Sequence, residues 1–387
     1  MSDFDVVIGL EIHIQLNTQS KLFAPEAHTF GASPNSLVSP ITMAHPGALP
    51  RINEAVIDKA LALGLALGCK INSPTYFDRK NYFYPDLPKG YQISQDAIPI
   101  CEGGSVTFPD TQGRLIEIPL ERIHLEEDAG KSIHDLSKVH SMIDLNRAGT
   151  PLMEMVTQPA IHQAEHAAAL FEEIRRLVRY LNVGDGDMEK GNLRCDANIS
   201  VKPTGQVALG TRVEVKNLNS FGFLTQAINH EVKRQIRLIQ SGEAVQRETR
   251  TWNVDLQQTQ PMRDKELAHD YRYFPEPDLP VITILPERID HIQSQLPTLP
   301  YQRFQQYHTT WKLPYNESIT LAEDLSWSRF FEEAITHCDN PKGIANWLLG
   351  PIRSWLSDEN KQLEALPLSA QTLGEMVKAI DSGRISH

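Results

Sequence analysis

The stretch VVIGLEIHIQL (residues 6–16) decides the fold that we expect for this chain. From Ile8 onward every second residue is apolar, and Glu11 and His13 occupy alternate positions. Because successive side chains of a β-strand point to opposite faces, the segment predicts a strand with one apolar and one polar face. Glu11 and His13 would lie roughly 6–7 Å apart, close enough to share a metal ion or a phosphate. A half-solvated strand without a function explains the same pattern.

The composition is that of a globular protein, with 387 residues, 41% hydrophobic and 22% charged. The net charge of −12 indicates that any contact with nucleic acid is local. The four cysteines show no CxxC spacing, which favours reduced thiols in a cytoplasmic protein and argues against a cysteine zinc site. The longest apolar run, near residues 60–69, is too short to cross a membrane, and the first residues carry no secretion signal.

The periodicity of the chain predicts an α+β body over residues 1–290 and a helical domain over residues 291–387. Four prolines between residues 275 and 286 mark the boundary. Strands are expected within residues 115–125, 187–203, 211–220 and 247–253, and helices within residues 54–67, 165–182 and 224–239. Residues 23–50 resemble a long ordered loop, and no rhythm of βαβ units is evident. In the helical domain, WSRFFEEAI, IANWLLGPIRSWL and TLGEMVKAI carry apolar stripes.

Acidic residues elsewhere could converge with Glu11 and His13; they are Glu126, Glu127, Asp128, Glu154 and Asp196. Glu154 stands inside the apolar run LMEMV, where a carboxylate either faces solvent or meets a cation, because burying it unpaired is costly. Mg²⁺ prefers oxygen ligands and keeps positions for water or phosphate, so several carboxylates with one histidine suit a metal–nucleotide site. Positive charge for phosphates could come from Lys80, Lys89, Arg212 and Lys216.

Seven segments carry a family resemblance, in this order: VIGLEIHIQL, DRKNYFYPDLPKGYQISQ, HLEEDAGKS, DLNRAGTPLMEMV, KGNLRCDANIS, VEVKNLNSFGF and DYRYFPEPD. They closely resemble the B subunits of the aspartyl/glutamyl-tRNA amidotransferases, the GatB family. The resemblance runs across the whole body with matching spacing and extends into the helical segment.

The resemblance implies a cradle domain related to glutamine synthetase, with a mainly antiparallel sheet, then a helical domain and a small tail domain that grips tRNA. The family enzyme is a heterotrimeric ligase that uses ATP and Mg²⁺ to phosphorylate the side-chain carboxylate of Glu-tRNA(Gln), and in many species of Asp-tRNA(Asn). Ammonia from the amidase (A) subunit then displaces the phosphate, and the small (C) subunit completes the assembly. Since this chain has no Ser- or Cys-centred nucleophile signature, its ammonia must come from a partner.

By resemblance, the metal and active-site residues are Glu11, His13, Glu127, Glu154 and Asp196, with Lys80 the cation near the reacting groups. Strand parity alone does not choose between Glu126 and Glu127, and the choice of Glu127 rests on the resemblance. Contacts with the nucleotide or the aminoacyl end are expected from Arg79, Asn198, Arg212, Glu214 and Lys216.

Two departures from the family pattern matter. Some members carry a cysteine zinc site in the loop before the first helix, and the absence of cysteine there makes structural zinc unexpected. The sequence also stops at His387, where the family continues into the tail domain, which implies weaker tRNA affinity with the cradle site intact. Two other hypotheses are a stand-alone carboxylate–ammonia ligase and a non-catalytic tRNA-binding scaffold.

Overall fold

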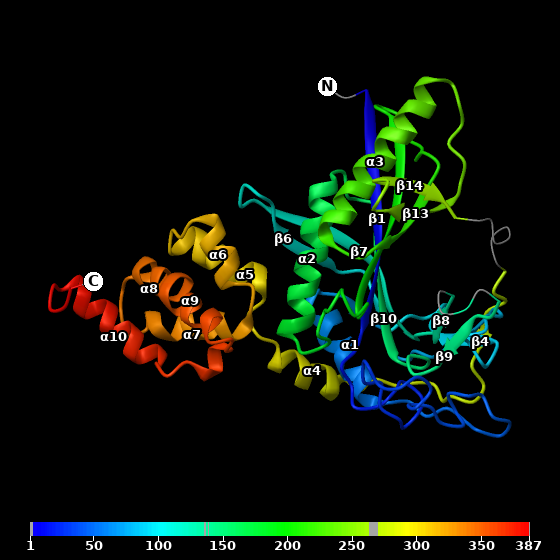
Figure 1. Cartoon of the computed structure of the whole chain (residues 1–387), viewed down its shortest axis with the longest axis horizontal. Helices are drawn as coiled ribbons and strands as arrows, with labels where there is room; N and C mark the ends of the chain where they lie inside the picture. The colour runs from blue at the N-terminus through cyan, green and yellow to red at the C-terminus, as the bar shows by residue number, and fades with distance from the viewer. Residues whose placement is uncertain (1–2, 135–136, 138, 263–269, 387) are drawn as a thin grey trace. The chain divides into compact units, whose positions relative to one another are not determined.

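A computed structural model of the chain describes residues 3–134, 137, 139–262 and 270–386. Strand β1 (Phe4–Gln15) lies in the middle of a ten-stranded sheet, which confirms the predicted strand (Figure 1). The other strands of this sheet are β2 (Lys70–Ile71), β5 (Cys101–Glu102), β6 (Ser105–Pro109), β7 (Leu115–Glu127), β10 (Pro151–Thr157), β11 (Leu193–Pro203), β12 (Val213–Leu218), β13 (Thr249–Asn253) and β14 (Gln258–Pro261). Their order is β14-β13-β12-β11-β1-β10-β7-β5-β2, and β6 pairs with β7.

The sheet is mainly antiparallel, as expected, but it also contains a parallel pair. Strands β12 and β13 run parallel and are joined by helix α3 (Phe221–Gln240). This crossover is a βαβ unit, and it is compatible with the absence of a βαβ rhythm in the sequence. A single crossover leaves no repeated alternation of strands and helices, which is the pattern by which sequence analysis detects such units.

The apolar face of the sheet forms the core of the body. Ile8, Leu10, Ile12 and Ile14 of β1 are at most 1% exposed. Helices α3 and α2 (Ala164–Tyr180) pack on each other and cover this face (Figure 1). Burying each such aliphatic side chain contributes about 1.5–3 kcal/mol, so this face fixes the strand register. The alternate residues of β1, Glu11 and His13 among them, must then point to the opposite face.

Smaller elements flank the large sheet. One sheet contains β3 (Asp78–Asn81), β4 (Tyr91–Ser94) and β15 (Phe274–Pro275), and a second contains β8 (Lys131–Ile133) and β9 (Met142–Asp144). Helix α1 (Glu54–Ala66) begins after Asn53, whose side chain accepts a hydrogen bond from the Ala55 amide. Residues 23–50 contain no helix or strand, which confirms the predicted loop.

The chain divides into two compact units. The first contains Met1–Val106 and Glu117–Leu296, including helix α4 (Pro286–Gln295), and the second contains Thr107–Ile116 and Pro297–His387. The helices of the second unit are α5 (Pro300–Gln305), α6 (Tyr315–Leu321), α7 (Leu325–Ile335), α8 (Pro341–Trp347), α9 (Arg353–Asp358) and α10 (Ala370–Asp381). Its core contains Phe304, Phe331 and Leu373, and the three striped segments are helical as predicted. Within the described ranges, no helix is long and apolar enough to cross a membrane.

Candidate active site

The polar face of the large sheet carries a row of facing side chains. On β1, His13 pairs with Glu154 of β10 on one side and with Arg194 of β11 on the other. Glu154 in turn pairs with His124 of β7. Directly opposed residues of antiparallel strands share a face, so Arg194, His13, Glu154 and His124 stand side by side across four strands.

The first group of close side chains, which we call the central cluster, contains His13, Glu126 and Glu154. One ligand atom from each lies within 4.8 Å of the others. The Nε2 atom of His13 lies 3.4 Å from Glu154 Oε2, and His124 Nε2 lies 3.4 Å from the same oxygen. His124 Nε2 is also 3.8 Å from Glu126 Oε2, so this histidine bridges the two carboxylates.

A second group, the outer cluster, consists of Glu11, Asp196 and Glu214, again with one oxygen from each within 4.8 Å of the others. The Asn198 side-chain amide donates a hydrogen bond of 2.8 Å to Glu11 Oε1. Lys216 Nζ lies 2.7 Å from both Asp196 Oδ2 and Glu214 Oε1. Sequence analysis named all five of these residues, and the structure brings them together in one place.

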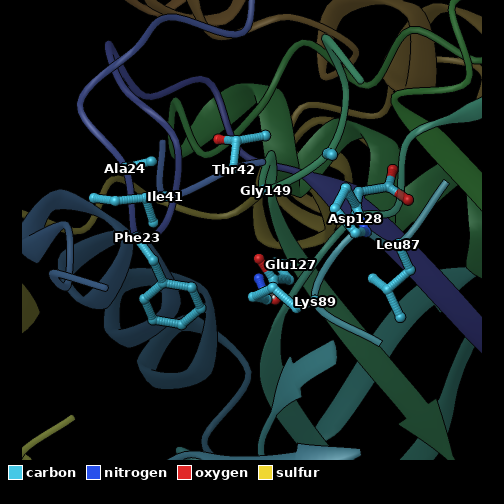
Figure 2. Close-up of a pocket in the computed structure, with 11 residues that line it drawn as sticks. Phe23, Ala24, Ile41, Thr42, Leu87, Lys89, Glu127, Asp128 and Gly149 are labelled. Atoms are coloured by element: carbon cyan, nitrogen blue, oxygen red, sulfur yellow. Dashed lines mark hydrogen bonds and ion pairs between the residues drawn. The ribbon is translucent and has the colours of Figure 1, made fainter. Parts of the chain in front are cut away.

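Glu127 lies outside both clusters. It pairs with Pro151 in register and therefore faces the opposite side of the sheet from Glu126. Its Oε1 accepts hydrogen bonds from Lys89 Nζ and, at 3.0 Å, from the Ile93 amide. Figure 2 shows Glu127 and Lys89 together in a small pocket that Phe23 also lines. The expectation that Glu127 joins His13 and Glu154 is corrected: alternation along β7 places Glu126 there instead.

The three remaining predicted cations have different surroundings. Lys80 lies near the central cluster, with Nζ 4.9 Å from the centre of the Tyr271 ring and close enough to Glu126 to act on its charge. Arg79 is paired with Glu276 through two hydrogen bonds of 2.7 and 2.9 Å and belongs to neither cluster. Arg212 is exposed and directly precedes β12.

Burial and pairing set the charge states of the central cluster. Burial alone would raise the pKa of Glu154 and Glu126, but the hydrogen bonds from His124 hold both pKa values below their usual range. Burial likewise disfavours the charged form of His124, yet the hydrogen bonds and charges of Glu126 and Glu154 raise its pKa to about 9. Burial and the negative charge of Glu154 raise the pKa of the Glu11 carboxyl.

The donor sets of the two clusters fit a divalent cation. The central cluster offers two carboxylates and one imidazole, and the outer cluster offers three carboxylates. Hard cations such as Mg²⁺ prefer oxygen ligands and leave positions for water or phosphate, whereas structural zinc sites use mainly Cys and His. The carboxylates are also largely buried, with Glu126 only 4% exposed, a placement that is stable when positive charge is close by.

Comparison with known proteins gives the family. Residues 6–290 match the family model of the GatB/GatE catalytic domain, and residues 329–387 match the GatB domain. The chain belongs to the GatB family. A relative from Myxococcus xanthus (strain DK1622) is 46% identical, covering 100% of this chain and 80% of the relative. Relatives from Thermodesulfovibrio yellowstonii and Clostridium tetani are 45% and 44% identical, over 99% and 100% of this chain and 80% of each relative. All three are named as the B subunit of an aspartyl/glutamyl-tRNA(Asn/Gln) amidotransferase.

Sequence analysis missed His124 in this GatB family chain. His124 and Glu126 stand two residues apart on β7, as Glu11 and His13 do on β1. This mirrored pairing of an imidazole with a carboxylate at strand spacing is a signal that could have identified both residues. Glu214 was expected to contact the nucleotide or the aminoacyl end, and one of its oxygens also lies within 4.8 Å of oxygens of Glu11 and Asp196, close enough to share a metal ion.

The raised pKa of His124 predicts a pH-dependent stability. Its folded-state pKa of about 9 exceeds its ordinary value of 6.5, so its contribution is full below 6.5 and is lost as pH rises through 9. We expect the free energy of unfolding, measured with a metal chelator, to fall by about 3 kcal/mol across this window. In His124→Gln this slope should shrink, while His45→Gln, at an exposed loop position, should keep the wild-type slope. Urea unfolding at several pH values tests this, and an unchanged slope in His124→Gln would contradict it.

Proposed function

We propose that this chain is the B subunit of a tRNA-dependent amidotransferase. It would use ATP and Mg²⁺ to phosphorylate the side-chain carboxylate of Glu-tRNA(Gln), of Asp-tRNA(Asn) or of both, and then amidate it. The observation that carries the proposal is the pair of acidic clusters on one polar sheet face, in a chain 44–46% identical to proteins named as this subunit.

The chemistry needs activation because a free carboxylate is a poor acyl donor. Phosphorylation converts one carboxylate oxygen into part of a phosphate leaving group, and ammonia then forms the amide bond as phosphate departs. Mg²⁺, when bound, would neutralise charge on the phosphate oxygens. His13, Glu126 and Glu154 would hold one such ion, and Glu11, Asp196 and Glu214 a second.

The cationic side chains complete the proposed site. Lys216, between two carboxylates of the outer cluster, and Lys80, near Glu126, would supply positive charge where charge develops on the phosphoryl group. Asn198 and Arg212 would contact the nucleotide. Arg79 has a structural role in this proposal, because its ion pair with Glu276 fastens β15 to β3.

The ammonia in this proposal comes from the amidase (A) subunit, with the small (C) subunit completing the cytoplasmic heterotrimer. All four cysteines are buried, and burial raises the pKa of the thiols of Cys69, Cys101 and Cys195, which disfavours the reactive thiolate. Residues 1–290 would carry the phosphorylation site, and residues 291–387 would form the helical domain.

The test is ADP release by the trimer reconstituted with the amidase and small subunits, given misacylated tRNA and ATP. We expect Glu11→Ala to lower the rate about 10- to 100-fold, because it removes a ligand of the outer cluster. Glu102→Ala, at a carboxylate on β5 whose side chain is 45% exposed, is the matched control and should leave the rate unchanged. A stand-alone ligase would instead release ADP with free glutamate and no partners, and a scaffold would release none. Unchanged release in Glu11→Ala would remove the assignment of the outer cluster.

A further inference from the structure

A cavity of about 760 Å³ opens beside the central cluster, at the end of β1. Gln15 follows His13 by two residues on the same face, and Arg194 pairs with His13 in register; both line the cavity. Loop residues 27–32 and residues 188–192 contribute other walls. The volume falls in the range of roughly 300–1,000 Å³ that pockets for small molecules span. The roles proposed above do not use this space.

The polar groups of the cavity favour an anionic ligand. Two of its three carboxylates already accept hydrogen bonds from the protein: Asp144 from the amides of Asn35 and Asn146, and Asp185 from the Asn192 side chain. Arg194 pairs with Asp128 through Nη2 at 3.1 Å, but its Nε is buried and has no hydrogen-bond partner in the part of the chain that the structure describes. The exposed Lys131 side chain adds a second cation to the lining. Unused donors on cationic side chains suit phosphate oxygens.

An aromatic side chain lines the same cavity as these cations. Phe30 lines the cavity and is 67% exposed, an unusual position for a large apolar ring. Exposed aromatic rings next to cationic side chains are the combination that holds unpaired nucleotides, because the base stacks on the ring while the cations meet the phosphate. The cavity therefore has the chemistry of a site for a single unpaired nucleotide.

Two substrates of the proposed reaction bring an adenosine: ATP and the 3′ end of the tRNA. The polar face of β1 carries, in order, Glu11 of the outer cluster, His13 of the central cluster and Gln15 of the cavity lining. In phosphoryl transfer the acceptor and the leaving group lie on opposite sides of the transferred phosphorus. Since the proposed nucleotide contacts surround the outer cluster, we infer that the cavity receives the aminoacylated 3′-terminal nucleotide of the tRNA. This inference rests on the function proposed above.

Photo-cross-linking in the reconstituted trimer tests the location directly. One arm uses misacylated tRNA ending in 8-azidoadenosine, and the other uses 8-azido-ATP with Mg²⁺. We expect the tRNA to label residues 27–32 or 188–192 and the ATP analogue to label neither segment. Labelling of these segments by 8-azido-ATP, or a tRNA label that falls elsewhere or nowhere, overturns the inference.

Two surface variants test the same site by kinetics. Phe30→Ser and Lys131→Glu change exposed side chains, so the fold should be kept. Each should raise the KM for misacylated tRNA about tenfold and leave the KM for ATP unchanged. Val207→Ser and Lys70→Glu, at exposed positions outside the cavity lining, are the matched controls. A rise in the KM for ATP instead, or no change in either KM, overturns the inference.

The two experiments separate this inference from the proposed function. Cross-linking requires binding but no turnover, whereas ADP release by the wild-type trimer tests the reaction. If ADP is released and the tRNA label lies outside the cavity, only the inference fails. If no ADP is released and the tRNA end still labels residues 27–32, the proposed reaction fails and the nucleotide site stands.

Discussion

In Glu126→Gln, we expect Mn²⁺ affinity to fall and ADP release by the reconstituted trimer to drop about 10²- to 10³-fold. The substitution keeps the shape of the side chain and an oxygen that can accept the 3.3 Å hydrogen bond from Ser94 Oγ. It removes one of the two carboxylate charges of the central cluster, which lie within 4.8 Å of the His13 nitrogen. A titration of bound Mn²⁺ by electron paramagnetic resonance measures the affinity without turnover.

Glu127→Gln is the matched control, because it makes the same change one residue along the strand. We expect its Mn²⁺ affinity and ADP release to stay close to the wild-type values. Its stability should fall by about 1–3 kcal/mol, since the buried carboxylate that pairs with Lys89 loses its charge. If Glu127→Gln loses Mn²⁺ and Glu126→Gln keeps it, the placement of these two side chains on opposite faces is wrong.

The sequence could not show which of Glu126 and Glu127 lies on the polar face of the sheet, and the structure of β7 explains why. The register of β7 against β10 shifts at one place: Val156 pairs with Arg122, and Thr157 pairs with Leu120, so Glu121 is left out of the pairing. Such a bulge exchanges the two faces of the strand. Ile118 and Leu120 are buried before it, and Ile123 and Leu125 after it. Counting alternate residues from Ile118 and Leu120 therefore places Glu127 on the polar face, whereas counting from Ile123 and Leu125 places Glu126 there.

On β1 the same reasoning succeeded because the strand alternates without interruption. From the alternation alone, Glu11 and His13 were expected on one face, and they lie there opposite Asp196 and Glu154. What the pattern could not supply was the strand order, because the pairing of β1 with both β10 and β11 joins segments far apart in the chain. The division of the site into a central and an outer cluster follows from that order.

Local signals predicted the helices well and long-range packing poorly. The apolar stripes predicted α2, α7 and α10, since each stripe lies within one helix. The same reading missed the short helices α5 and α6, which have too few turns for a clear period. The sequence also could not show that residues 107–116 belong to the second unit. In this segment Gly113 lies against His308. A hairpin sequence indicates the turn and not the surface that it contacts.

The second large effect is expected in the helical unit, in Glu332→Ala. Arg303 of α5 is 5% exposed, and Glu332 of α7 binds its guanidinium through contacts of 2.7 and 3.1 Å. The Tyr307 hydroxyl donates a further 2.8 Å hydrogen bond to the same carboxylate. Removing the carboxylate leaves a guanidinium buried without its counter-charge, a change that costs about 3–5 kcal/mol. Urea unfolding of the full chain, followed by tryptophan fluorescence, measures the loss, because Trp311 stacks on Tyr307 at 5.1 Å.

Two further variants identify the cause. Glu333→Ala, next in sequence but exposed, should change the free energy of unfolding by no more than about 0.5 kcal/mol. Glu332→Gln should lie between the two, because the amide oxygen still accepts a hydrogen bond from Tyr307 or Arg303 while the charge is lost. Equal stabilities of Glu332→Ala and Glu333→Ala would mean that Arg303 reaches solvent once its partner is gone. The ion pair would then be a consequence of the packing of α5 against α7 and not one of its causes.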